Sequence, residues 1–391
     1  MSWRSCVRRA VDGFDTAVER AARRRVLFHV RTAMHASVLD PVARILERDR
    51  RIDVRYCSER PGDHRPIADA CGRPLRWTAA WQARWMRVDL LVTADPWCPP
   101  ELSRCRRRVN FFHGVAGKYD LDSPGHLPAG FDQYDRIAFV NTDRMRRYLD
   151  QGIVSRAAAV LVGFPKIDAL VNGRYDGAAV RQRLGLEMHR RTAIYAPTWS
   201  PASSLNLAGE AIVASLVEAG WNVILKPHAR SLEPDEKYSG GIDWRRRLRA
   251  VELPGRVVFS EDADGSPLLA ASDLMVTDHS SIGFEFCLLD RPLIVFDAPD
   301  LARVARINPE RVAALRGAAR VVTDAAMVGR TANEEMECPQ RLRAERAAAA
   351  QPLFHEPGSA TERALDLLYS ALDLPPYDVR GMSTTPLGAR L

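Results

Sequence analysis

The stretch VTDHSSIGFEFCLLDRPLIVFD, residues 276–297, carries the pattern that decides the fold class. Two apolar runs, at residues 273–277 and 292–297, have the length and the aliphatic content of buried strands. The residues between them predict a helix. A strand, a helix and a second strand in this order predict a parallel βαβ unit.

The junction between the first strand and the helix is unusually polar. It contains Asp278, His279, Ser280 and Ser281 in succession. A helix N-terminus needs only one such residue as a cap. The excess favours a ligand site at this junction over simple capping by Asp278 or a serine.

The same alternation of strand and helix runs along most of the chain. A polar stretch near 171–191 interrupts it, and the pattern then starts again. Further strands are predicted at residues 25–30, 51–58, 89–95, 108–114, 135–141, 158–165, 192–199, 221–228 and 256–262, and helices at 35–48, 75–87 and 360–372 among others. We therefore predict an α/β protein of two doubly wound, Rossmann-like domains.

The predicted boundaries divide the chain into four parts. Residues 1–25 form a basic amphipathic helix, 26–175 an N-terminal Rossmann-like domain, 176–372 a C-terminal Rossmann-like domain, and 373–391 a disordered tail. The helix at 1–25 is either docked on the body of the protein or held at an anionic membrane surface.

Composition narrows the class of protein. The chain of 391 residues has a net charge of +7, no apolar run long enough to span a membrane, and no secretory signal at its start. Its seven cysteines are scattered without a CxxC pair, which indicates reduced thiols in a cytoplasmic protein. There is no GxGxxG motif for a nicotinamide cofactor and no recognisable nucleic-acid-binding module.

The segment FFHGVAGKYD, residues 111–120, follows a predicted strand. His113, in this segment, is suited to act as general base on an acceptor hydroxyl, because the ordinary pKa of histidine lies near the working pH. Gly114 lets the backbone approach a ligand closely, and Lys118 is suited to a phosphate. The alternative for His113 is a strand-end histidine bonded to the backbone. The spacing excludes a Walker A phosphate loop.

Two further strand ends are polar. Thr198, in YAPTWS, lies at a strand-to-helix turn where backbone amides can hold an anion, or it is an ordinary turn residue. Lys226, His228 and Arg230, in LKPHAR, put three potential cations after one strand. This cluster favours a polyanionic ligand over a solvated basic turn.

The last group of candidate site residues lies in the stretch 276–297. We expect the hydroxyls of Ser280 and Ser281 and the nearby backbone N–H groups to bind phosphate, with Thr277 and Asp278 beside them. Glu285 comes on the next turn of the helix and can accept hydrogen bonds from ribose hydroxyls. The alternative places Glu285 on the helix surface.

Taken in order, HGVAGK, VGFPKID, YAPTW, LKPH and TDHSSIGFEFCLLDRPLIVF resemble the CDP-glycerol glycerophosphotransferase family, the teichoic-acid primase and polymerase type. The resemblance covers roughly residues 105–300 and, more loosely, 357–368. It implies a GT-B fold, in which two domains face each other across a cleft. The N-terminal domain, 26–175, would then bind the acceptor and the C-terminal domain, 176–372, the donor nucleotide. The family usually has tyrosine where this chain has His279.

The resemblance also implies roles for matched residues. His113 matches the base that deprotonates the acceptor hydroxyl, and His228 the histidine that contacts the donor phosphates. Ser280 and Ser281 match the serines beside the donor diphosphate, Glu285 an acidic position at the ribose, and Thr198 a threonine near the donor. The implied reaction moves glycerol phosphate, or a related polyol phosphate, from a CDP-linked donor to a hydroxyl of a lipid-linked or polymeric acceptor.

In this mechanism the acceptor hydroxyl attacks the β-phosphorus and CMP leaves. We expect no metal or other cofactor, because basic side chains and N–H groups can stabilise the diphosphate. We expect the protein to work in the cytoplasm, or peripherally at the inner face of the cell membrane. Alternatives are a GT-B glycosyltransferase with a nucleotide-sugar donor, a nucleotide-sugar 2-epimerase, and a non-catalytic protein that binds nucleotide or anionic polymer.

Overall fold

The computed structural model describes residues 23–95, 102, 104–115 and 130–377. The described chain forms two compact units. Unit 1 contains residues 23–113, 130–168 and 355–377 within these limits, and unit 2 contains 114–115 and 169–354. The helix predicted at 1–25 falls almost entirely outside the described residues, as does most of the tail predicted at 373–391.

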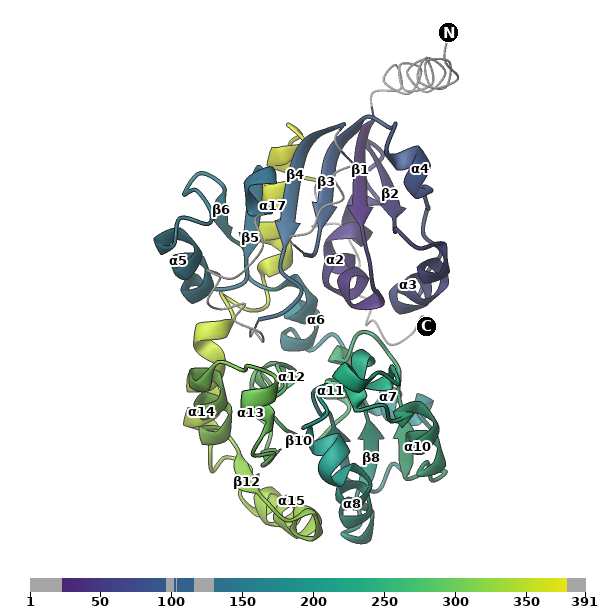
Figure 1. The fold of residues 1–391 in the computed structure, drawn as a ribbon, viewed down its shortest axis with the longest axis vertical. Helices are drawn as coiled ribbons and strands as arrows, with labels where there is room; N and C mark the ends of the chain where they lie inside the picture. Colours follow the sequence, from purple (N-terminus) through teal and green to yellow (C-terminus); the bar gives the residue numbers. More distant parts are fainter. Residues whose placement is uncertain (1–22, 96–101, 103, 116–129, 378–391) are drawn as a thin grey trace. The chain divides into compact units, whose positions relative to one another are not determined.

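Unit 1 is built on a six-stranded parallel sheet in the order β2-β1-β3-β4-β5-β6 (Figure 1). Its strands are β1 (Arg24–His29), β2 (Ile52–Cys57), β3 (Val88–Thr93), β4 (Cys105–Phe111), β5 (Arg136–Phe139) and β6 (Ala159–Leu161). Its helices are α2 (Ala33–Leu46), η1 (Pro61–Asp63), α3 (His64–Cys71), α4 (Ala80–Ala83), η3 (Phe131–Gln133), α5 (Thr142–Asp150), η4 (Pro165–Ile167) and α17 (Ala360–Ala371).

Unit 2 repeats the architecture with a second six-stranded parallel sheet, in the order β12-β11-β10-β7-β8-β9. Its strands are β7 (Thr192–Tyr195), β8 (Asn222–Leu225), β9 (Val257–Phe259), β10 (Leu274–Thr277), β11 (Leu293–Phe296) and β12 (Arg320–Val322). Its helices are α6 (Asp168–Val171, which begins at the last residue of unit 1), α7 (Gly177–Arg183), α8 (Ser204–Glu218), η5 (Ala229–Leu232), α9 (Glu236–Ser239), α10 (Trp244–Ala250), α11 (Ser266–Ala270), α12 (Ile282–Cys287), α13 (Leu301–Val304), α14 (Pro309–Gly317), η6 (Ala325–Met327), α15 (Val328–Glu337), α16 (Arg343–Ala350) and η7 (Gln351–Leu353).

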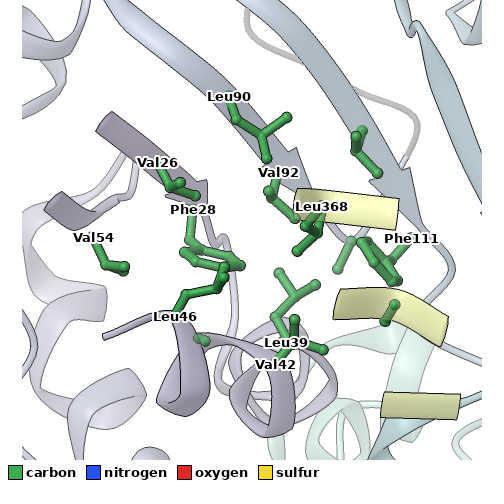
Figure 2. Close-up of a cluster of buried hydrophobic side chains, with 14 of the residues drawn as sticks. Val26, Phe28, Leu39, Val42, Leu46, Val54, Leu90, Val92, Phe111 and Leu368 are labelled. Atoms are coloured by element: carbon green, nitrogen blue, oxygen red, sulfur yellow. The ribbon is translucent and has the colours of Figure 1, made fainter. Parts of the chain in front are cut away.

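The two parallel sheets confirm the predicted fold class. Strands such as β1, β7, β8, β10 and β11 contain short apolar runs that are buried on both faces. In unit 1 the side chains of one sheet face pack against α2, as Figure 2 shows for Phe28, Leu39 and Val42. Burial of each such side chain contributes about 1.5–3 kcal/mol.

The last helix departs from the predicted domain boundary. Residues 355–377 belong to unit 1, although the sequence pattern assigned everything from 176 to 372 to the C-terminal domain. Leu368 of α17 is fully buried in the unit 1 core with Phe111 (Figure 2), and Tyr369 donates a hydrogen bond to Asp49 at 3.0 Å. The order of elements along the chain does not show that the last helix packs in the N-terminal unit.

The helix predicted at 75–87 is also wrong for most of its length. Only Ala80–Ala83 are α-helical. The preceding residues run parallel to β2, because the Tyr56 N–H donates to Arg76 O at 2.9 Å and the Thr78 N–H donates to Tyr56 O at 2.8 Å. These hydrogen bonds outweigh the helical spacing of the apolar side chains.

Candidate functional site

Buried hydrogen bonds join the end of β10 to the loop between β7 and α8 and to the first residue of α8. The Asp278 carboxylate accepts from the Thr198 N–H at 2.8 Å and from the N–H and hydroxyl of Ser204 at 3.1 and 3.0 Å. Thr277 donates its hydroxyl to Ala196 O at 2.6 Å. Both side chains are fully buried. Thr277 and Asp278 therefore position the β7–α8 segment, and their place at the donor site stays a prediction.

The two serines that follow are not used as helix caps. Ser281 immediately precedes α12, and its side chain makes no capping hydrogen bond. Asp278 is also not the cap, since its carboxylate binds the β7–α8 loop. α12 has only six residues, so its dipole is small, and the phosphate role of Ser280 and Ser281 rests on their hydroxyls and local N–H groups. Glu285 is 6% exposed on α12, which contradicts the surface alternative.

His228 follows β8 and has one ring nitrogen committed to the backbone. Its Nδ1 accepts the Arg230 N–H at 3.1 Å, at the start of η5. Because a backbone N–H only donates, Nδ1 carries no proton in this arrangement, and the neutral ring carries its proton on Nε2. His228 is thus held as a hydrogen-bond donor at Nε2, which is the state suited to a phosphate oxygen.

Arg230 is held by aromatic rings. Its guanidinium carbon lies 4.7 Å from the Trp199 ring centre and 5.2 Å from that of Tyr238, and the two rings meet edge to face. The His228 ring is 6.2 Å from the Trp199 ring. Contact with aromatic faces limits the motion of the exposed arginine. Lys226 lies two residues before His228, and its Nζ is 3.4 Å from Pro227 O.

These contacts identify two site residues that sequence reasoning missed. Trp199 and Tyr238 were not predicted to take part, although Trp199 directly follows Thr198 in the YAPTWS motif. Thr198 itself is buried, and its N–H is bound to Asp278. An aromatic residue beside a strand-end motif was the available signal, whereas nothing in the sequence pointed to Tyr238.

In unit 1, His113 follows β4 and has the opposite arrangement of ring nitrogens. Its Nδ1 lies 2.9 Å from Ala94 O. Because a carbonyl only accepts, Nδ1 carries the proton and Nε2 of the neutral ring has the lone pair. The alternative was a strand-end histidine bonded to the backbone, and Nδ1 does make such a bond. The same bond puts the proton on Nδ1, so Nε2 is the unprotonated nitrogen that can accept a proton. Gly114 is half-buried, and Lys118 lies outside the described residues.

A second histidine and a carboxylate accompany His113. The rings of His35 and His113 have their centres 5.1 Å apart, and His35 Nδ1 is 3.7 Å from Asp95 Oδ2. Sequence reasoning missed both residues. Asp95 ends the strand predicted at 89–95, and His35 begins the helix predicted after the strand at 25–30. Polar side chains gather at such strand ends in a parallel sheet. The prediction that no metal is needed stays a prediction; the described residues include no group of three or more His, Cys, Asp or Glu placed to hold one.

Comparison with known proteins adds family information. Residues 131–306 match the family described as CDP-Glycerol:Poly(glycerophosphate) glycerophosphotransferase. The chain is 29% identical over 147 residues to the teichoic acid glycerol-phosphate transferase of Staphylococcus aureus, covering 37% of this chain and 36% of that protein. It is 26% identical over 141 residues to the teichoic acid glycerol-phosphate primase of Bacillus spizizenii, covering 34% and 32%. The matched stretches thus span about a third of these curated relatives.

Solved structures show that the fold is shared more widely. The wall teichoic acid polymerase TagF matches with a TM-score of 0.67 at 16% identity, over 90% of this chain and 89% of that chain. A UDP-N-acetylglucosamine 2-epimerase matches with a TM-score of 0.57 at 15% identity, over 91% and 99%. At these identities the likeness is one of fold, and it confirms the predicted GT-B architecture.

Proposed function

We propose that this chain, whose residues 131–306 match the CDP-glycerol glycerophosphotransferase family, is a transferase acting on a CDP-linked polyol phosphate. It moves glycerol phosphate, or a related polyol phosphate, to a hydroxyl of a cell-surface polymer or a lipid-linked acceptor. The observation that carries the proposal is the hydrogen bond between His113 Nδ1 and Ala94 O. It supports a ring whose Nε2 is ready to take a proton.

The acceptor hydroxyl attacks the β-phosphorus of the donor, and its proton passes to Nε2 of His113. A new P–O bond forms while the bond from the β-phosphorus to the bridging oxygen breaks. CMP leaves with that oxygen and with the electron pair of the broken bond. Proton transfer and phosphoryl transfer therefore balance without an added co-reactant.

The donor-side residues stabilise the negative charge of the leaving nucleotide. His228 donates from Nε2, because its Nδ1 is occupied by the Arg230 N–H. Lys226 and Arg230 supply positive charge, and the hydroxyls of Ser280 and Ser281 supply further donors. Preorganised donors of this kind stabilise transition-state charge because they need little reorganisation during the reaction. Glu285 accepts hydrogen bonds from the ribose.

The test is a donor screen with the purified full chain. We expect CMP release from CDP-glycerol or CDP-ribitol in the presence of a hydroxyl acceptor, and none from UDP- or GDP-sugars. Release of UDP or GDP would favour a glycosyltransferase, and conversion of a nucleotide sugar into its 2-epimer would favour a 2-epimerase. No turnover with any donor would favour a binding protein.

His113→Ala isolates the role of the base. We expect loss of transfer by about 100-fold or more with donor affinity largely unchanged, because general-base catalysis contributes roughly 10²–10⁴-fold. His64→Ala is the matched control, since the His64 ring also stacks on another aromatic residue of unit 1, Trp77 at 4.0 Å. Loss of donor binding in His113→Ala would contradict the role of base.

The proposal extends to the place of action. No helix in the described part of the chain is long and apolar enough to cross a bilayer. We propose that the protein works in the cytoplasm at the inner face of the cell membrane, where basic residues within 1–25 and a net charge of +7 favour anionic lipid. Flotation with anionic and neutral vesicles tests this. Equal recovery with both vesicle types would contradict the electrostatic attraction.

A further inference from the structure

Three residues of unit 1 lie around His113, and the family resemblance gives none of the three a role. The His113 cluster consists of Arg31, His35, Asp95 and His113. Arg31 follows β1, His35 lies in the first turn of α2, Asp95 follows β3, and His113 follows β4. The carboxyl ends of three neighbouring parallel strands thus contribute to one group of side chains.

One short turn after β3 contacts both histidines. Ala94 O accepts from Nδ1 of His113 at 2.9 Å. The adjacent Asp95 carboxylate lies 3.7 Å from Nδ1 of His35 and 3.3 Å from Nη1 of Arg31. The position of this turn therefore sets the orientation of His113 directly, and that of His35 through an ion pair.

The turn itself is held by buried hydrogen bonds. Asp95 O accepts from Asn110 Nδ2 at 2.5 Å, from Thr93 Oγ1 at 3.0 Å and from Tyr134 Oη at 3.2 Å. All three donors come from buried side chains. Because these bonds go to the backbone carbonyl, the Asp95 carboxylate remains available for the ion pairs with His35 and Arg31.

We propose that His35, held by Asp95, is a positioning residue for His113. The His35 ring packs against the His113 ring with a tilt of 35° and is itself only 8% exposed. This contact limits rotation of the His113 ring and keeps Nδ1 on Ala94 O, so that Nε2 retains the lone pair. The catalytic consequence rests on the proposed function of His113, whereas the structural coupling does not.

Simple core packing explains the cluster less well. The Asp95 side chain is 4% exposed, and a buried carboxylate costs free energy unless charged partners compensate. Apolar residues at both positions 35 and 95 would fill the space without this cost. A base that is oriented by another side chain is, in contrast, a recurrent arrangement in enzymes that activate a hydroxyl.

The first test is independent of activity. Histidine ring nitrogens are labelled with ¹⁵N in the full chain, and His113 is assigned by the signal lost in His113→Gln. We expect His113 to show a protonated Nδ1 and an unprotonated Nε2 above its pKa. In His35→Ala the two nitrogen shifts should move toward averaged values, because the ring is no longer held. Unchanged shifts would overturn the proposal.

Three comparisons keep this test informative. His35→Phe retains a ring but loses the Asp95 ion pair, and Asp95→Asn retains His35 but weakens its anchor, so both should give smaller changes than His35→Ala. His64→Ala should leave the His113 signals unchanged. If His35→Ala does not fold, His35→Phe and Asp95→Asn decide the question, and wild-type shifts in both would refute the coupling.

Kinetics then separates positioning from a general loss of structure. We expect His35→Ala to lower kcat about 10- to 100-fold with the KM for the donor little changed, because small displacements of a reacting group cost about this much. In a His113→Ala background the same substitution should have almost no further effect. Additive losses would refute action through His113. If the wild-type chain has no transferase activity, the proposed function fails, and the nitrogen shifts still decide whether His35 holds His113.

Discussion

Replacement of Asp278 by alanine tests how unit 2 builds its donor site. The Asp278 carboxylate binds the Thr198 N–H in the loop between β7 and α8, and the N–H and hydroxyl of Ser204, the first residue of α8. It is fully buried. Asp278→Ala therefore leaves three donors without their acceptor, in the loop that carries Thr198 and Trp199 and at the start of α8.

The magnitude follows from these three contacts. A buried donor that loses its partner costs about 1–3 kcal/mol, so three give about 3–9 kcal/mol. The space freed by the carboxylate can admit a water molecule, which accepts some of these bonds. We therefore expect the free energy of local opening of the loop to fall by about 3–5 kcal/mol, the lower part of this range.

Hydrogen exchange of the full chain measures this quantity. Peptides that cover residues 196–204 should exchange roughly a hundred- to several-thousand-fold faster in Asp278→Ala, since about 1.4 kcal/mol corresponds to a factor of ten. Asp273→Ala is the matched control. Asp273 precedes the same strand, accepts the Thr192 N–H at 2.8 Å, and pairs with Arg181. Its loss should affect the start of β7 alone. Unchanged exchange of 196–204 in Asp278→Ala would refute the reasoning.

Four other outcomes are expected. His228→Gln, which can retain a donor near the position of Nε2, should bind donor better than His228→Asn, which can retain only the Nδ1 acceptor for Arg230; isothermal titration with CDP-glycerol checks the order. Ser281→Ala should raise the Kd for the same donor about tenfold, because it removes a hydrogen bond to a charged group, and a wild-type Kd would contradict the phosphate role. EDTA should leave transfer unchanged; inhibition that Mg²⁺ reverses would contradict metal independence. Burial, and then the charge of Arg31, lowers the pKa of His29 from 6.5 to about 4, so the unfolded chain takes up a proton that the folded chain does not. Stability is lost as the pH falls from 6.5 towards 4, by about 2 kcal/mol between pH 7 and 5. Urea unfolding should show a weaker pH dependence in His29→Phe, and an unchanged one would contradict this assignment.

The strand pattern was predictable because most of the parallel strands, those inside the sheets above all, are buried on both faces. Runs such as VLFH in β1 and LIVF in β11 are continuous and apolar, and their periodicity does not depend on distant contacts. The polar residues after these strands were predictable for a related reason. Parallel strands end at one edge of a sheet, and ligands bind there.

Long-range pairing could not be predicted in the same way. The segment around Trp77 has helical spacing, but it lies beside β2 because backbone hydrogen bonds to Tyr56 are available there. The helix α17 packs in unit 1 because Leu368 fits a core made by β1, β3 and β4. Both outcomes depend on residues that are distant in sequence.

The sequence by itself determined the fold class, the strand ends that carry polar residues, and the resemblance to one family. Only the tertiary structure decided what each polar side chain does. Asp278 and Ser281 stand three residues apart, yet Asp278 is committed to the β7–α8 loop, while the hydroxyl of Ser281 is not used to cap α12. His113 and His228 both follow strands, but one donates from Nδ1 and the other accepts there. The physical reason is that hydrogen bonds decide which nitrogen of an imidazole carries the proton and which groups a carboxylate binds. The partners in these bonds are set by the fold and are often distant in sequence.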